Sequence, residues 1–115
     1  MSAEPKILQD PLYQLLRDED IKGFNQARAD GNTVDLRGGD FRGLDLRGLE
    51  AHGLDLSNAY FRGADLRGID LSHSRLEGAS IANANISGCY FPKELSADEL
   101  LLSINHGTRM RYNTP

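Results

Sequence analysis

The sequence predicts a solenoid bracketed by short helical caps, and three observations lead to that prediction. First, the chain divides into twelve consecutive pentads from Val34 to Lys93 without an insertion. Second, the third residue of every pentad is apolar, a period that neither a helix nor a simple strand sustains over 60 residues. Third, helix-start signals flank the repeat on both sides. A fixed internal repeat of this kind is typical of solenoids.

The pentads resemble those of the pentapeptide-repeat family, whose consensus is A-[DN]-[LF]-x-x. ADLRG, ANISG and ASIAN fit it closely, and LDLRG and IDLSH fit with a larger first residue. Members of this family fold as a β-helix in which each pentad forms one of four sides. The resemblance therefore implies an all-β chain: a right-handed quadrilateral β-helix of three coils at residues 34–93. Residues 1–33 and 94–115 then form α-helical caps, and the whole chain is one structural domain.

The third residues of the pentads are expected to point inward and fill the axis. Each should stack on the residue twenty positions later, about 4.8 Å away, as neighbouring strands do. Gly or Asn at the fifth position suits the corners, because both tolerate unusual backbone angles. The small Ala51 should leave room that Leu44, Leu49 and Leu54 fill. The predicted core consists of Leu36, Phe41, Leu46, Leu56, Phe61, Leu66, Leu71, Leu76, Ile81, Ile86 and Phe91.

The N-terminal flank predicts a helical hairpin. Asp10 before Pro11 is a helix-start signal, and either Asp18 or Asp20 can cap a second helix that stops before Gly31. The segment is acidic and lacks a basic recognition face, so a DNA-reading helix pair is disfavoured. We expect the hairpin to cover the first coil with its apolar residues Leu12, Leu16, Ile21 and Phe24.

The C-terminal flank predicts one helix that starts at the capping box Ser96-Ala97-Asp98-Glu99 and ends near Gly107. Two interpretations stay open: a lid over the third coil, or a dimer contact. Three consecutive leucines exceed what one face of a lid requires. In the best-known members of the family two solenoids meet at this end, so the resemblance implies a homodimer through the C-terminal end.

The charge pattern limits the partners. Residues 34–93 hold eight acidic and seven basic side chains, so neither a basic patch nor an acidic stripe is expected. Direct binding to nucleic acid is therefore not predicted. The final segment is either a mobile tail or a docking peptide. The candidate interaction surface comprises Arg42, Tyr60, Arg62, Leu101, Leu102, Arg109, Met110, Arg111 and Tyr112.

The sequence offers no constellation for catalysis, and the chain is not predicted to be an enzyme. No glycine-rich loop or zinc-ligand spacing occurs, so no cofactor and no metal are expected, although His52 and His73 can approach each other. The lone Cys89 is interpreted as a buried apolar group. No leader or membrane-spanning run is apparent, which predicts a cytoplasmic chain without membrane contact.

Two functions follow as expectations. A rigid rod with a preorganised backbone suits protein binding, because little entropy is lost on docking. This favours a non-enzymatic protein-protein interaction or scaffold module, whether it recruits a partner or packs within a larger assembly. The resemblance implies the alternative, since some pentapeptide-repeat proteins imitate B-form DNA and modulate DNA gyrase. Three coils span only about 14 Å, and the balanced charge also argues against imitation of DNA.

Overall fold

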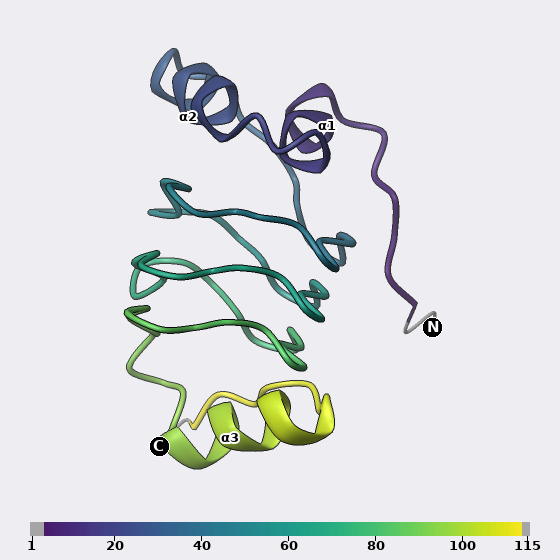
Figure 1. The fold of residues 1–115 in the computed structure, drawn as a ribbon. Helices are drawn as coiled ribbons and strands as arrows, with labels where there is room; N and C mark the ends of the chain where they lie inside the picture. The colour runs from purple at the N-terminus through teal and green to yellow at the C-terminus, as the bar shows by residue number, and fades with distance from the viewer. Residues whose placement is uncertain (1–3, 114–115) are drawn as a thin grey trace.

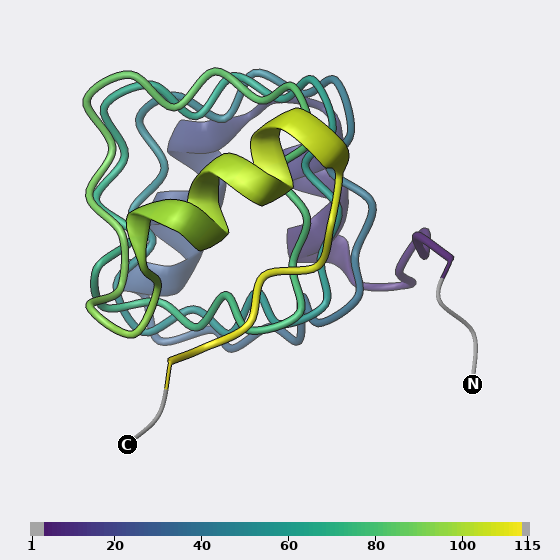
Figure 2. The same cartoon turned by 90° about the horizontal axis from the view of Figure 1, so that it is seen from below.

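The centre of the molecule is a stack of rectangular coils, which we call the coil stack (residues 34–93). The structure is a computed structural model that describes residues 4–113. Parallel bridges join residues twenty positions apart, as from Asp40 to Tyr60 and from Tyr60 to Ser80. Figure 1 shows α1 (Pro11–Arg17) and α2 (Ile21–Ala29) at one end of the stack, and α3 (Ala97–His106) at the other. The outline seen along the axis is roughly square (Figure 2).

The prediction of an all-β, right-handed quadrilateral β-helix is wrong. Within residues 4–113 the β-pairing between coils is confined to isolated bridges, and the regular elements are the three α-helices. The physical reason is the length of the repeat. Turns generally occupy the fourth and fifth residues of a pentad, and usually only its second residue bridges to a neighbouring coil. A strand needs several consecutive paired residues, and a side this short does not supply them.

The corners require a left-handed backbone conformation. Asn58 has a φ of 59°, and Gly78, one coil further along the stack, has a φ of 81°. Asn adopts this conformation more readily than most residues, whereas a side chain at Gly78 would be strained by its φ and would displace the Asn58 side chain. A Cβ atom there would clash with the side-chain amide oxygen of Asn58. Successive corners therefore pack closely on one another.

The axis of the coil stack is filled by inward-pointing apolar side chains. Phe41 and Phe61 lie parallel with their ring centroids 5.2 Å apart, and Tyr13 meets Phe41 edge-on at 5.5 Å. Around Ala51, Leu49 and Leu54 are buried. Ile86 and Phe91 are only partly buried. The other nine residues of the predicted core are buried: Leu36, Phe41, Leu46, Leu56, Phe61, Leu66, Leu71, Leu76 and Ile81.

The two N-terminal helices begin at aspartates. Asp10 precedes α1 and accepts a hydrogen bond from Leu12 N, and Asp20 precedes α2 and accepts one from Gly23 N. These side chains satisfy amide groups that have no partner inside the helix. Tyr13, Leu16 and Phe24 are buried in the core that the helices share with the first coil. The hairpin therefore covers the N-terminal end of the axis.

Polar side chains of this cap satisfy the exposed backbone of the first coil. Asn25 accepts from Glu50 N and donates to Gly48 O, at 3.0 and 2.9 Å. Arg28 donates to the carbonyl oxygens of Glu50 and His52, both at 3.1 Å. Glu19 accepts from the amide of Asp45. A preceding coil would pair most of these backbone groups of the first coil, and side chains of the cap pair them instead.

The segment before α1 adds backbone pairing to the same end. Lys6 forms a parallel bridge with Gly39, and its carbonyl oxygen accepts from Asp40 N at 2.9 Å. The buried Tyr13 hydroxyl donates to the carbonyl oxygen of Asp40 at 2.7 Å, and that of Lys6 lies 3.3 Å away. Burial raises the pKa of Tyr13. This contact was not predicted, since residues 4–8 carry no repeat pattern.

The C-terminal end is covered by α3 and by the segment that follows it. Ser96 caps α3 by accepting from Glu99 N, and Gly107 ends the helix with a φ of 70°. Figure 2 shows α3 crossing the end of the stack diagonally, with the chain then running back along the coil. None of the helices within residues 4–113 has both the length and the apolar character needed to cross a membrane.

Candidate functional site

The charged side chains of the coil sides pair within their own pentads. Arg37 and Asp35 form a two-pronged ion pair at 2.8 and 2.9 Å, and the Asp-x-Arg sequence repeats this arrangement in three further pentads. One ion pair joins consecutive coils, from Arg47 to Asp65 at 3.4 Å. The Asp-x-Arg pairs are Asp35–Arg37, Asp40–Arg42, Asp45–Arg47 and Asp65–Arg67.

These pairs lower the pKa values of the aspartates. The hydrogen bond from the neighbouring arginine holds the pKa of Asp35 and of Asp45 at about 2. For Asp40, which is almost buried, the bond from Arg42 lowers the pKa against the opposing effect of burial. Because each carboxylate is neutralised by a base two residues away, the coil sides carry little long-range field.

The predicted surface around Arg42, Tyr60 and Arg62 is partly engaged within the molecule. Arg42 is tied to Asp40, while Arg62 is exposed and forms no ion pair within residues 4–113. The half-buried Tyr60 meets Arg109, whose guanidinium donates to its hydroxyl at 2.6 Å and lies 5.6 Å from the ring centre. The structure therefore brings Tyr60 together with the C-terminal segment.

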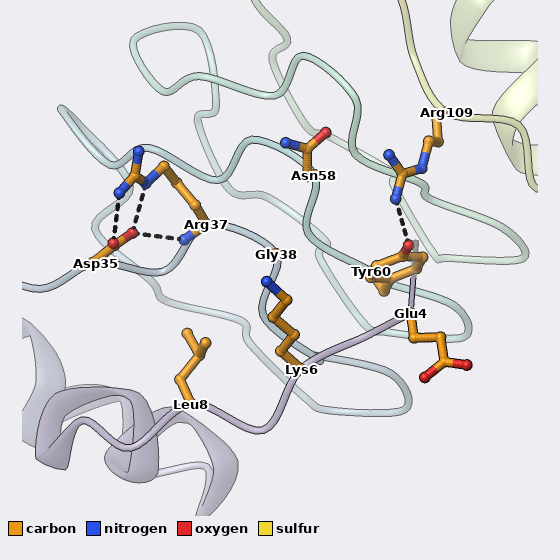
Figure 3. Close-up of a pocket in the computed structure, with 9 residues that line it drawn as sticks. All are labelled: Glu4, Lys6, Leu8, Asp35, Arg37, Gly38, Asn58, Tyr60 and Arg109. Atoms are coloured by element: carbon orange, nitrogen blue, oxygen red, sulfur yellow. Dashed lines mark hydrogen bonds and ion pairs between the residues drawn. The ribbon is translucent and has the colours of Figure 1, made fainter. Parts of the chain in front are cut away.

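Tyr60 and Arg109 line a groove of about 480 Å³, shown in Figure 3. Four stretches of the chain build it: the N-terminal segment, the first coil, the second coil and the C-terminal segment. It presents cationic and anionic side chains beside a single leucine, so no one ligand charge is favoured. Its lining comprises Glu4, Lys6, Leu8, Asp35, Arg37, Gly38, Asn58, Tyr60 and Arg109.

Residues 108–113 are docked on the third coil, so the alternative of a mobile tail is wrong for them; residues 114–115 of that segment lie outside the described residues. Met110 is fully buried, and its backbone bonds to Gly78 and Ala79 at 2.7 and 2.8 Å. Met110 therefore cannot serve as an accessible contact residue, contrary to its place in the predicted surface. Its burial stabilises the cap through apolar contact.

The neighbours of Met110 are likewise engaged. Glu99 accepts a hydrogen bond from Arg111 N at 3.0 Å and pairs with the Arg111 guanidinium at 2.8 Å, and these contacts lower the pKa of Glu99. The half-buried Tyr112 accepts a hydrogen bond from Leu76 N at 2.9 Å. Arg111 and Tyr112 hold the segment against α3 and the third coil, so their first role is internal.

The outer face of α3 exposes apolar surface. Leu101 is 57% exposed and Leu102 is 40% exposed. They line a shallow hollow of about 380 Å³ with Asp98, Asn105 and His106. Among residues 4–113 the other large apolar side chains left exposed are Ile7 and Tyr90. Tyr90, at 69% exposure, belongs to the last pentad, so three of these four side chains lie toward the C-terminal end. The prediction missed Tyr90, although it occupies an outward position where most pentads carry a polar residue.

The histidines and the cysteine form no evident reaction centre. His52 and His73 lie with ring centres 5.0 Å apart, beside Glu50 and Asp70. Yet within the described chain no three His, Cys, Asp or Glu side chains are arranged to hold a metal ion. The half-buried Cys89 thiol donates to Leu66 O, and burial raises its pKa, which disfavours the reactive thiolate.

Comparison with known proteins agrees with the repeat pattern. The family described as Pentapeptide repeats (8 copies) matches residues 32–63 and 55–91, which together cover slightly more than half of the chain. No curated protein and no solved structure matched. The matched region coincides with the coil stack, whose bridges follow the twenty-residue interval of four pentads. The chain belongs to the pentapeptide-repeat family.

Proposed function

We propose that the protein is a non-enzymatic interaction or scaffold module that binds a protein partner at the C-terminal end of the coil stack. The observation that carries this proposal is the exposure of Tyr90, Leu101 and Leu102 on a packed and hydrogen-bonded framework. Leu101 and Leu102 line one hollow on the outer face of α3, and exposed apolar surface of this kind is typical of binding sites. The surrounding cap is held by Met110 and by the Arg111–Glu99 pair, so little ordering is required on binding.

The charged sides give less support to the alternative, a DNA-mimic modulator of DNA gyrase. Imitation of DNA requires rows of unpaired negative charge, whereas the Asp-x-Arg pairs neutralise the aspartates locally.

The test is affinity capture from the source cells with three matched baits. The unchanged chain and Arg62→Glu, which alters an exposed residue of a coil side, should retain the same protein. The double variant Leu101→Glu with Leu102→Glu should lose it. Purified partner should then bind the three baits in the same order by calorimetry. The proposal is wrong if no protein distinguishes the double variant from the other two.

A homodimer through the C-terminal end is the competing occupant of this surface. Light scattering of the purified chain at micromolar concentration separates the two. A mass of one chain is expected when a different protein is the partner. A mass of two chains that falls to one in the Leu101→Glu, Leu102→Glu variant would assign the surface to self-association instead.

A further inference from the structure

The amide groups of the third coil are unequally covered. In the coil before it, seven amides at third and fifth pentad positions donate to carbonyl oxygens of the next coil, for example Leu66 N to Asn85 O at 2.9 Å. The third coil has no successor, so its seven equivalent amides face the C-terminal end. These belong to Leu76, Gly78, Ile81, Asn83, Ile86, Gly88 and Phe91.

Four of the seven amides are satisfied by the C-terminal cap. Leu76 N donates to the Tyr112 hydroxyl at 2.9 Å, and Gly78 N to the carbonyl oxygen of Met110 at 2.7 Å. Ile81 N donates to the Ser103 hydroxyl at 2.9 Å, and Asn83 N to the carbonyl oxygen of Ile104 at 3.0 Å. These four amides lie on two adjacent sides of the coil, residues 74–83.

The other two sides, residues 84–93, remain open. The amides of Ile86, Gly88 and Phe91 find no acceptor within residues 4–113. The carbonyl oxygens of Ala84 and Cys89 also lack the donors that their equivalents one coil earlier, Ala64 and Ile69, receive. We call this edge, residues 84–91, the open edge.

Side-chain burial divides along the same line. Of the four inward side chains of the third coil, Leu76 and Ile81 on the covered sides are 1% and 0% exposed. Ile86 and Phe91 on the open edge are only partly buried. The backbone is therefore unpaired, and the axis less completely covered, at the same two sides.

The pattern of donors and acceptors defines what fits there. Along the open edge the carbonyl oxygen of Ala84, the amides of Ile86 and Gly88, the carbonyl oxygen of Cys89 and the amide of Phe91 follow one another. An anion would supply acceptors only. An extended peptide backbone supplies both kinds of group, as Met110 does on the covered sides by accepting from Gly78 N and donating to Ala79 O.

We propose that the open edge binds an extended segment of another protein through backbone hydrogen bonds, with apolar side chains of that segment contacting Ile86 and Phe91. This inference rests on the proposed function, since it specifies how a protein partner is held at the C-terminal end. Edge pairing supplies affinity through the main chain, while the half-buried Ile86 and Phe91 select apolar residues. Without a bound segment, an unpaired edge can pair with other chains and cause aggregation, and a bound segment prevents this.

The first test is amide hydrogen exchange of the free protein, measured residue by residue by NMR. The open-edge amides should exchange at least about tenfold faster than the covered amides of Leu76, Gly78, Ile81 and Asn83, because exposed groups open at little cost. Equal protection in both groups at low concentration would overturn the proposal. Protection of the open edge that grows with protein concentration would also overturn it, because the occupant would then be a second copy.

The second test uses displayed random linear peptides of about ten residues, enough to line two sides of the coil. Selected peptides should slow exchange of Ile86, Gly88 and Phe91 and leave the covered amides unchanged. N-methylation of a central peptide residue should weaken binding by about tenfold, since it removes a backbone donor without changing the side chain. Tolerance of N-methylation at every position would overturn the proposal.

The two proposals fail separately. Peptides that protect amides of α3 or of the Arg62 side, and leave the open edge unprotected, would overturn the edge inference while an interaction module remains. If the library yields no peptide that binds, the edge inference is wrong, whereas the capture experiment decides the proposed function independently. The readout concerns the unmodified chain, so no variant has to survive a change in its core.

Discussion

Tyr13→Phe tests whether the N-terminal cap is held by polar contacts to the first coil. The Tyr13 side chain is fully buried, and its hydroxyl donates to Asp40 O at 2.7 Å. Removing only the hydroxyl keeps the edge-on contact with Phe41. Arg17 still reaches the Asp40 carbonyl at 3.4 Å and offsets part of the loss. A buried carbonyl deprived of its main donor costs about 1–3 kcal/mol, and we expect the lower half of that range.

The assay is unfolding in denaturant and by heat, followed by circular dichroism. One kcal/mol lowers the melting temperature of a domain of this size by about 4 °C, so a fall of about 4–8 °C is expected. Tyr90→Phe is the matched control, because Tyr90 is 69% exposed and should lose nothing measurable. Equal stability of Tyr13→Phe and the unchanged chain, or an equal loss in Tyr90→Phe, would refute the reasoning.

Three further predictions concern the core, the docked segment and acid stability. Met110→Ala should lower the free energy of unfolding by about 2–5 kcal/mol, because a fully buried side chain is removed. The control Arg109→Ala should lower it by under about 1 kcal/mol. Denaturant titration measures the free energy of unfolding of both variants. Phe61→Asp should abolish folding, because it places a charge on the axis of the coil stack. Arg62→Glu alters an exposed residue and should leave the circular dichroism spectrum unchanged. If both variants fold equally well, the pentad register is wrong. The pKa of Asp40 is lowered in the folded state, so between that lowered value and the ordinary value near 3.8 the unfolded state binds more protons than the folded state. Stability therefore falls as the pH drops from about 4 toward the lower folded pKa. Asp40→Asn should make that fall shallower, and an unchanged acid titration would contradict the pairing with Arg42.

The repeat and its register were readable from the sequence, but the absence of regular strands in the coils was not. The apolar third residues follow a strict local period, and the bridges do join residues twenty apart, as Tyr60 and Ser80 show. Pairing in consecutive residues, which a strand requires, depends on how much of each pentad the corners consume. The positive φ values at corners such as Asn58 and Gly78 leave too few residues per side. Family resemblance therefore overstated the strand content.

The helix ends were also readable, because capping is local. Asp10, Asp20 and Ser96 each accept a bond from an amide two or three residues later. In contrast, the docking of Met110 and the bridge of Lys6 to Gly39 join segments tens of residues apart with no repeating signal. Such contacts depend on the shape of the finished stack.

The candidate surface was only partly predictable for the same reason. Exposure of Leu101 and Leu102 follows from three consecutive leucines on a helix that buries one face. The engagement of Tyr60 by Arg109 and the open edge at Ile86 and Phe91 depend on the path taken by the C-terminal segment. Composition carries no information about that path.

Photocrosslinking in the source cells tests the central claim, that the C-terminal end of the coil stack binds a protein. Tyr90 is replaced by benzoylphenylalanine, which keeps an aromatic ring at an exposed position, and Arg62 is replaced in a control. The account predicts a discrete adduct with another protein from position 90 and none from position 62. Adducts from position 62 alone, or from position 90 only to a second copy of the chain, would contradict it.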